Sequence, residues 1–265
     1  MKKAFVTKVH RIDTEIDKMR MKRKDTDTLK VKENVFDTPT LKSLYNLSNK
    51  GFIRAMGGSI STGKEANVFL ADGEDGEIAV KIYRISTSTF NTMEDYILGD
   101  PRFTNIRHKK QDIIFAWTRK EFRNLERARN AGVQVPAPII TERNILLMEF
   151  MGEQGNPYPL LKETALENED AQRIFDTIVE YMRALYMDAN LVHADLSEYN
   201  IMINPHDLSP ILIDMGQSVT LEHSHANDFL HRDIQNIARF FKRFGVETSP
   251  DELYSFIRSK EQIKK

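Results

Sequence analysis

The chain has 265 residues, 40% of them hydrophobic, which is enough to build one large domain or two lobes around a cleft. Its 38 lysines and arginines nearly balance its 39 aspartates and glutamates, so the net charge of -1 says little about partners, and any nucleic-acid contact would need a local patch. The absence of cysteine excludes a disulfide framework, a thiolate zinc site, an iron–sulfur cluster and a cysteine nucleophile.

Residues 1–50 are mostly charged and are interpreted as a basic, helical N-terminal extension. The bases gathered between Lys18 and Lys24 predict either a solvated helix face or a contact with RNA or an acidic partner. Charged residues rather than an apolar core follow Met1, so we expect no signal peptide, and no apolar run approaches the ~20 residues that span a bilayer. We therefore expect a cytoplasmic protein with no membrane partner and no DNA partner.

Residues 51–150 are predicted to form a β-rich N-terminal lobe. Two strands, Asn67–Ala71 and Glu77–Tyr83, flank a Gly-Glu-Asp-Gly turn and predict a hairpin. The second strand alternates, with one face formed by Ile78, Val80 and Ile82 and the other by Ala79, Lys81 and Tyr83.

The rest of this lobe is predicted to be a loop, a helix and a second pair of strands. Ile85–Lys110 is polar and aperiodic and is interpreted as a long functional loop. Gln111–Asn130 has the apolar periodicity of a helix and stops before Gly132. Short strands are expected at Ile139–Ile140 and Ile145–Met148.

Residues 151–265 are predicted to form a helical C-terminal lobe that follows a hinge rich in glycine and proline. A long helix at Asp170–Ala189 precedes two buried strands at Ile201–Ile203 and Ile211–Ile213. An amphipathic helix is expected at Phe229–Phe244, and a shorter one begins at Pro250. The order of elements indicates an α+β, bilobal fold.

The strongest functional pattern is His193-Ala-Asp-Leu-Ser-Glu-Tyr-Asn200 followed by Ile213-Asp-Met-Gly216. Phosphoryl transfer needs a carboxylate to orient or deprotonate the nucleophile, and ligands for the magnesium that neutralises the phosphates. Kinases place the catalytic aspartate five residues before a metal-binding asparagine, and a second metal-binding aspartate after the next strand pair. Asp195, Asn200 and Asp214 match this pattern, which predicts an ATP-dependent phosphotransferase with a protein-kinase-like fold.

Lys81 is the predicted phosphate-contacting residue of the N-terminal lobe. On its strand it could reach the α- and β-phosphates if a helix glutamate held it in place. Glu121, in the middle of the predicted helix, is the candidate partner, and Glu126 is the alternative.

The stretch from Ser61 to Val68 resembles the kinase phosphate-binding loop. It keeps Gly63 and Val68 and replaces the outer glycines by Ser61 and Ala66, which are small enough for backbone amides to approach phosphate. A P-loop is the competing interpretation, but Glu65 occupies the Ser/Thr position and a strand follows, so we reject it.

A second His-Arg-Asp sequence, at residues 231–233, imitates a catalytic loop. Its asparagine, Asn236, comes only three residues after Asp233, and the segment lies inside an amphipathic helix. We expect Asp233 to brace the true catalytic loop by hydrogen bonds.

With these residues the chain resembles the RIO family of atypical serine/threonine protein kinases, and within it the Rio-one subfamily. The resemblance covers roughly residues 50–245 and rests on three segments: Ser61–Phe69, Leu191–Asn200 and Ile211–Gln217. It implies that Asp195 is the catalytic base and that Asn200 and Asp214 bind Mg2+ or Mn2+.

The resemblance also implies how ATP is bound. Backbone groups of Glu149 and Met151, just after Met148, would contact adenine. The other ATP contacts, over the triphosphate, would come from Ser61, Gly63, Lys64, Glu65, Ala66, Val68 and Lys81, the last of these held by Glu121.

Family members act in late maturation of the small ribosomal subunit, so a subunit precursor with its rRNA and proteins is the implied partner. Autophosphorylation on serine in the 85–110 loop is implied as well, at Ser86, Ser88 or a nearby threonine. Transfer of phosphate to the metal-binding aspartate, proposed in the family, would here involve Asp214. Both a kinase and an ATPase activity stay open.

The short chain after Asp214 contains no Ala-Pro-Glu, so we expect a minimal C-terminal lobe without activation segment or peptide-docking helices. One alternative is a small-molecule phosphotransferase of the aminoglycoside or choline kinase type, although such enzymes carry a large helical insert. Another is a non-catalytic, nucleotide-binding assembly factor. The intact set of Lys81, Asp195, Asn200 and Asp214 argues against it.

Overall fold

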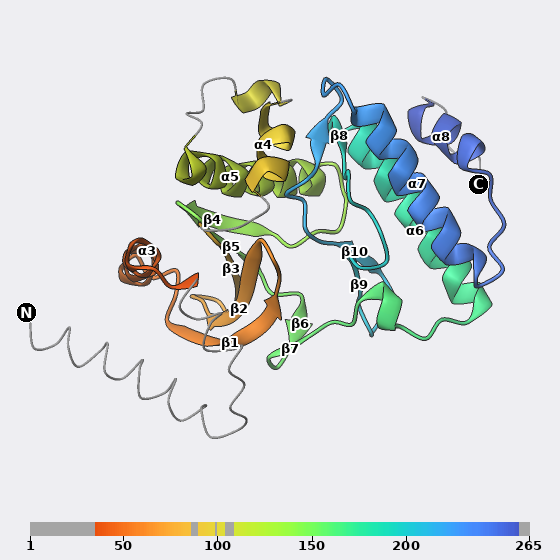
Figure 1. Cartoon of the computed structure of the whole chain (residues 1–265). Coiled ribbons are helices and arrows are strands. Elements are labelled where there is room, and N and C mark those ends of the chain that lie inside the picture. The colour runs from red at the N-terminus through yellow and green to blue at the C-terminus, as the bar shows by residue number, and fades with distance from the viewer. Residues whose placement is uncertain (1–34, 86–89, 99, 104–108, 260–265) are drawn as a thin grey trace, which may run out of the picture.

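The computed structural model describes residues 35–85, 90–98, 100–103 and 109–259. The basic stretch between Lys18 and Lys24 lies outside the described residues, as do Ser86 and Ser88, so the predictions made for them stay predictions. Figure 1 shows two lobes side by side, one built on a sheet and the other on helices. The α+β, bilobal class expected from the sequence is confirmed.

A five-stranded antiparallel sheet forms the N-terminal lobe, in the order β1-β2-β3-β5-β4. Its strands are β1 (Ala55–Thr62), β2 (Ala66–Asp72), β3 (Glu77–Tyr83), β4 (Pro138–Glu142) and β5 (Ile145–Glu149). The sequence predicts all of them except β1. That strand lies at the sheet edge with mostly exposed residues and a glycine pair, so it lacks the alternation that marks a half-buried strand.

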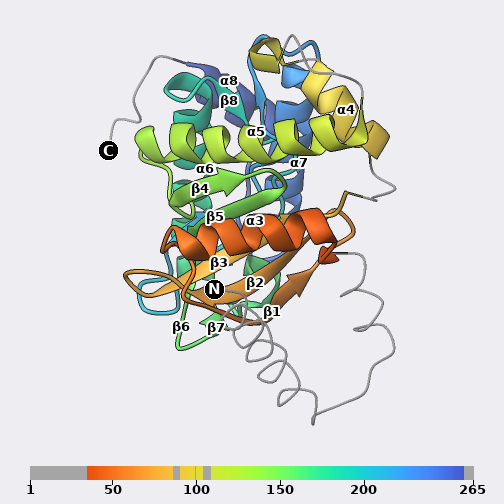
Figure 2. The same ribbon diagram turned by 90° about the vertical axis from the view of Figure 1, so that its left-hand side faces the viewer.

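The two faces of β3 contact different parts of the protein, as the alternation predicts. Val80 and Ile82 are fully buried under helix α3 (Thr38–Asn49), where they pack in one cluster with Leu47. Asp37 caps this helix by accepting from the amide of Thr40 at 2.8 Å. Figure 2 shows α3 lying across the sheet, so the described part of the predicted N-terminal extension packs on the lobe. The domain boundaries at 50 and 150 stay predictions.

Helices α4 and α5 lie on the opposite side of the sheet from α3 (Figure 1). Helix α5 spans Lys110–Asn130, close to its predicted bounds. The prediction of an irregular loop over Ile85–Lys110 is wrong, because the structure has α4 at Phe90–Leu98 and a 3-10 turn at Pro101–Phe103.

The buried residues of α4 explain this difference. Met93, Tyr96 and Ile97 have helical spacing, and the Tyr96 ring meets the Trp117 ring of α5 edge-on at 6.0 Å between centroids. The sequence of α4, FNTMEDYIL, does carry apolar residues at helical spacing, but over only nine residues inside a longer polar stretch, and so the helix was missed.

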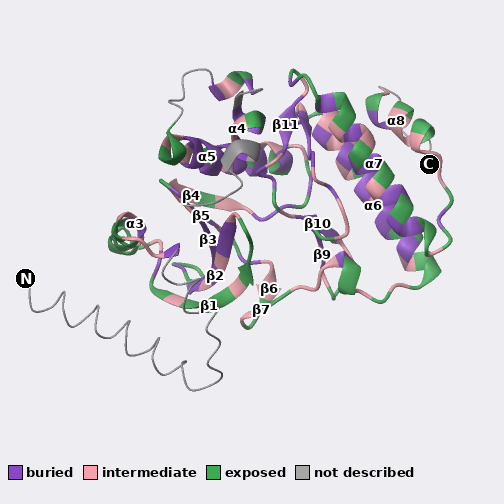
Figure 3. Ribbon diagram, in the orientation of Figure 1, coloured by how far each residue is buried: buried purple, intermediate pink, exposed green. Residues whose placement is uncertain are grey.

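Helices α6 (Asn168–Met187), α7 (Ala226–Lys242) and α8 (Pro250–Arg258) form the C-terminal lobe and confirm the predicted ones. Figure 3 shows long buried stripes on α6 and α7, and Phe175 meets Phe241 across them at 5.4 Å. The predicted hinge region holds a small hairpin, β6 (Gly152–Glu153) with β7 (Asn156–Pro157). Among the described helices, none combines the length and the apolar character that a membrane crossing requires.

Two short strand pairs lie in the segment between α6 and α7. β8 (Leu191–Val192) pairs with β11 (Val219–Thr220), and β9 (Ile201–Ile203) pairs with β10 (Pro210–Leu212). The chain passes from Asp214 to α7 through Met215–His225 alone, so the lobe has no activation segment of the standard protein-kinase kind.

We predict that Leu47→Ala lowers the free energy of unfolding by about 2–5 kcal/mol, since it leaves a cavity between α3 and the sheet. Leu41 is on the same helix and 51% exposed, so Leu41→Ala is the matched control, with a change within about 0.5 kcal/mol. Urea unfolding of both variants measures the difference. Equal effects would show that α3 does not stabilise the sheet.

Candidate active site

The hairpin between β1 and β2 carries the residues predicted to cover a triphosphate. All of them except Lys81, which lies on β3, are within it: Ser61, Gly63, Lys64, Glu65, Ala66 and Val68. The amide of Gly63 donates to the carbonyl of Ala66 at 2.9 Å, which makes the turn tight, and its tip is exposed. Strand β2 follows this turn, so the P-loop interpretation, which requires a helix there, is excluded.

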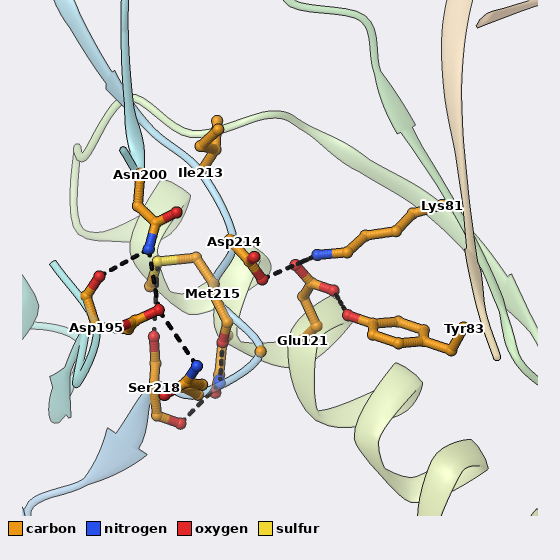
Figure 4. Close-up of polar contacts among 12 residues, drawn as sticks. Lys81, Tyr83, Glu121, Asp195, Asn200, Ile213, Asp214, Met215 and Ser218 are labelled. Atoms are coloured by element: carbon orange, nitrogen blue, oxygen red, sulfur yellow. Dashed lines mark hydrogen bonds and ion pairs between the residues drawn. The ribbon is translucent and has the colours of Figure 1, made fainter. Parts of the chain in front are cut away.

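Lys81 joins the two lobes at the centre of the site (Figure 4). Its Nζ donates to Glu121 Oε1 at 2.6 Å and to Asp214 Oδ1 at 3.0 Å. Tyr83, two residues further along β3, donates its hydroxyl to the other oxygen of Glu121. Glu121 is therefore the partner of Lys81, whereas the alternative, Glu126, is exposed.

The electrostatics of this group favour the ionised forms of Lys81 and Asp214. Burial would lower the pKa of Lys81, but the carboxylates of Asp214 and Glu121 outweigh it and hold that pKa above its ordinary value. The ammonium of Lys81 in turn lowers the pKa of Asp214. Asp214 therefore stays negatively charged at neutral pH, as a cation ligand must.

Asp195 and Asn200 lie on one loop, between β8 and β9. The Asn200 side-chain amide donates to the Asp195 carbonyl at 2.7 Å and to Asp195 Oδ2 at 3.1 Å. Gln217, on the neighbouring segment, donates to the same Oδ2 at 3.2 Å. Burial, together with the charge of Asp214, raises the pKa of Asp195, which makes its carboxylate a better proton acceptor.

Helix α7 braces the loop that carries Asp195 through its His-Arg-Asp sequence at residues 231–233. Asp233 is 1% exposed and accepts from the amides of Ala194 at 2.8 Å and Leu196 at 2.9 Å, which confirms the predicted brace. Arg232 donates to the Ala194 carbonyl, and Asn236 donates to the Leu196 carbonyl at 3.1 Å. These bonds hold Ala194 in a left-handed conformation, with a φ of 66°, just before Asp195.

His193 ties the Asp195 loop to the strand end that carries Asp214. Its Nε2 lies 3.1 Å from the Ile213 carbonyl and donates to it. Its Nδ1 is buried and has no hydrogen-bond partner within the described residues. Burial lowers the pKa of His193 to about 4, so the ring is neutral near pH 7.

The segment after β5 presents the backbone groups predicted to bind adenine. Met148 and Glu149 end β5, and the Glu149 amide donates to the Ala137 carbonyl at 2.8 Å, so the carbonyl of Glu149 is the group that could accept from a ligand. The Met151 carbonyl accepts from Tyr158 at 3.0 Å, so its amide is the group that could donate. An acceptor and a donor two residues apart suit the edge of an adenine ring.

The residues present fit a divalent cation held together with phosphates. Asn200 uses its amide nitrogen within the loop, so its oxygen points away from Asp195 (Figure 4). The Asp214 side chain is half exposed although one oxygen meets Lys81. No cluster of three or more acidic or histidine ligands exists in the described part of the chain, and Mg2+ typically takes only one or two protein ligands in addition to phosphate oxygens and water.

Sequence reasoning missed several supporting residues of this site: Tyr83, Gln217, Arg232, Asn236, Lys120 and Asn124. For the last two a signal exists. Trp117, Lys120 and Asn124 fall on one side of α5 at helical spacing, and a polar residue within an apolar stripe indicates a buried polar contact.

We predict that Asp233→Asn lowers the free energy of unfolding by about 1–3 kcal/mol, because an amide cannot accept from both loop amides and leaves one unpaired. Turnover should fall as well, since the loop carries Asp195. Denaturant unfolding and ATP turnover measure the two effects. An Asp233→Asn protein with both properties unchanged would contradict the brace.

Stability should also depend on pH through His193. The unfolded chain, with an ordinary histidine pKa of 6.5, takes up a proton that the folded chain refuses until about pH 4. The free energy of unfolding should therefore fall by up to about 3 kcal/mol as the pH drops from 6.5 to 4. His193→Gln should flatten that part of the curve in urea titrations. His206→Gln, at an exposed position, should leave it unchanged; identical curves for all three proteins would exclude His193.

Comparison with known proteins agrees with this geometry. A family model described as the RIO domain matches residues 67–253, which is more than half of the chain. The RIO-type serine/threonine-protein kinase Rio1 of Haloferax volcanii is 50% identical over 252 residues, covering 95% of this chain and 85% of that protein. Its counterpart in Methanocaldococcus jannaschii is 43% identical over 204 residues, covering 77% and 69%. The chain matches only 38% of the length of human serine/threonine-protein kinase RIO1, at 38% identity.

Solved structures show the same fold. The Rio2 kinase from Chaetomium thermophilum superposes with a TM-score of 0.64 at 25% identity, covering 84% of this chain and 68% of that one. A complex of that kinase, described as an ADP/Mg2+-phosphoaspartate complex, gives a TM-score of 0.62 at 24% identity, covering 82% and 64%. The chain belongs to the RIO family of atypical serine/threonine protein kinases and, within it, to the Rio1 subfamily.

Proposed function

We propose that this kinase transfers the γ-phosphoryl group of ATP to a serine or threonine, with Asp195 as the base for the acceptor hydroxyl. The observation that carries the proposal is Lys81, which joins Glu121 and Asp214 beside the loop of Asp195 and Asn200. This arrangement supports the proposal, because phosphoryl transfer requires a cation near the phosphates, ligands for magnesium and a base, and burial with the charge of Asp214 raises the pKa of Asp195.

ATP would bind between the lobes. The β1–β2 hairpin would cover the triphosphate, Lys81 would contact the α- and β-phosphates, and the Glu149 carbonyl and Met151 amide would hold adenine. Magnesium, when bound to Asn200 and Asp214, would neutralise the negative charge of the phosphate oxygens. Asp195 would then orient the attacking hydroxyl and take up its proton.

The identity of the phosphate acceptor is a more specific part of the proposal. Membership of the RIO family supports a role in the cytoplasm on precursors of the small ribosomal subunit, with rRNA and proteins as partners, and autophosphorylation between residues 85 and 110. A phosphoaspartate has been described for the Rio2 kinase. In this chain the corresponding acceptor would be Asp214, which would make the protein an ATPase when the acyl phosphate is hydrolysed.

We predict that Asp195→Ala keeps ATP affinity and loses turnover by about a hundredfold or more, because it removes the base and not a nucleotide contact. Asp214→Ala should lose the magnesium-dependent part of nucleotide binding. Calorimetry with and without magnesium and a turnover assay measure the two effects. Asp251→Ala, at an exposed position in α8, is the control. Unchanged turnover in Asp195→Ala would remove Asp195 from its role.

The assay that separates the acceptors incubates the protein with magnesium and γ-labelled ATP, alone and with small ribosomal subunit precursors. Acid-stable label on serine between residues 85 and 110, or on an added protein, would support a kinase. Free phosphate that rises with the precursor and requires Asp195 and Asp214 would support an ATPase. No product in either form would contradict catalysis.

A further inference from the structure

Helix α5 contacts the Asp214 segment, defined here as residues 214–218, through two buried polar side chains. Lys120 is fully buried, and its Nζ donates to the carbonyls of Gly216 at 2.8 Å and Ser218 at 2.5 Å. Asn124 is also fully buried and donates to the carbonyls of Met215 at 2.8 Å and Ser218 at 2.9 Å. Three backbone carbonyls that follow Asp214 are thus held by one face of one helix.

Burial lowers the pKa of Lys120 to about 7, but its amine can donate both hydrogen bonds in either protonation state. Its Nζ lies over the rings of Trp117, at 5.2 Å, and Tyr96, at 5.9 Å from their centroids. Burial of this amine costs hydration, which the hydrogen bonds to the two carbonyls have to offset. What an apolar side chain cannot supply is two donors aimed at two carbonyls.

The orientation of Asn124 is fixed by a second layer of contacts. Arg102 donates from Nη1 to Asn124 Oδ1 at 3.0 Å, so the amide nitrogen has to face the Asp214 segment. Asp100 in turn holds Arg102 through an ion pair of 2.5 Å. The contact of Asn124 is therefore directional and does not depend on packing alone.

The packing between α5 and the segment is also close. A Cβ atom at Gly216 would lie 2.9 Å from Trp117 Nε1, so only glycine allows the backbone to approach the helix this far. Asp214 itself has a left-handed φ of 62°, and its side chain points at Lys81 (Figure 4). The backbone after Asp214 faces α5, while its half-exposed carboxylate meets Lys81.

We propose that Lys120 and Asn124 are positioning residues that fix the Asp214 segment, so that α5 sets both partners of Lys81. Glu121 on α5 holds Lys81 directly, and its neighbour Lys120 holds the segment that presents Asp214 to the same ammonium. The short passage from Asp214 to α7 contains no activation segment that could do this instead. The functional part of this inference rests on the proposed role of Asp214 in binding a cation.

Three near-isosteric substitutions on α5 test the proposal. Lys120→Met and Asn124→Leu remove the donors, whereas Thr118→Val removes a buried hydroxyl that donates only within the helix, to the Ile114 carbonyl at 2.9 Å. Hydrogen exchange of a peptide covering residues 214–218, normalised to a peptide from α6, is measured without nucleotide. Calorimetry then gives the ratio of the ADP dissociation constants without and with magnesium.

We expect the exchange of the 214–218 peptide to rise about tenfold or more in Lys120→Met and Asn124→Leu, and the magnesium ratio to fall by a similar factor. Thr118→Val should show neither effect, although it loses stability. If Lys120→Met behaves like Thr118→Val in both measurements, or exchanges faster with an unchanged magnesium ratio, the proposal is wrong. Should Lys120→Met fail to fold, Asn124→Leu decides by the same criteria.

The two measurements also separate this inference from the proposed function. A wild-type chain whose ADP affinity does not respond to magnesium would contradict the proposed function. The exchange data, which need no nucleotide, would then decide by themselves whether Lys120 and Asn124 fix the segment. A magnesium response that is lost only in the variants supports both proposals.

Discussion

A buried ammonium between two carboxylates is the constraint around which the molecule is organised. Lys81 is 7% exposed and comes from a strand, Glu121 is 1% exposed and comes from a helix, and Asp214 follows a strand of the other lobe. An unpaired ammonium at the depth of Lys81 would be costly, so this side chain couples the sheet to α5 and to the C-terminal lobe. The same geometry leaves the Asp214 side chain half exposed although one of its oxygens meets Lys81.

The two loops that carry the chemistry contain few apolar side chains, so packing alone cannot fix them. Helices supply the missing constraints through polar side chains. α7 holds the Asp195 loop by Asp233, and α5 holds the segment after Asp214 by Lys120 and Asn124. Each of these side chains bonds to backbone amides or carbonyls, which fixes the path of the loop without engaging the side chains of Asp195 and Asp214.

The predictions succeeded where a local pattern reports a local structure. The alternation of β3 predicted which of its residues share a face, because strand geometry alone decides that. The structure shows that one face packs with α3 and the other meets Glu121 of α5. Prediction failed at α4 and β1. The apolar residues Met93, Tyr96 and Ile97 of α4 are covered by Trp117 and its neighbours on α5. The strand β1 is an exposed edge that is held in the sheet by pairing with β2. The helix α4 is stabilised by packing against α5, and the strand β1 by hydrogen bonds to β2.

The sequence by itself determined the chemistry: the spacing of Asp195, Asn200 and Asp214, the strand position of Lys81, and the candidate role of Asp233 as a brace. These were recognised as patterns of residue type and spacing, although the contact of Asp233 with the loop joins residues 37–39 positions apart and required the tertiary structure to be seen. Only the tertiary structure decided which glutamate meets Lys81, that Gln217 reaches Asp195, and that Lys120 lies buried against the backbone after Asp214. Those contacts join residues far apart in sequence. They depend on how α5 and the two lobes pack together, which a local sequence pattern cannot predict.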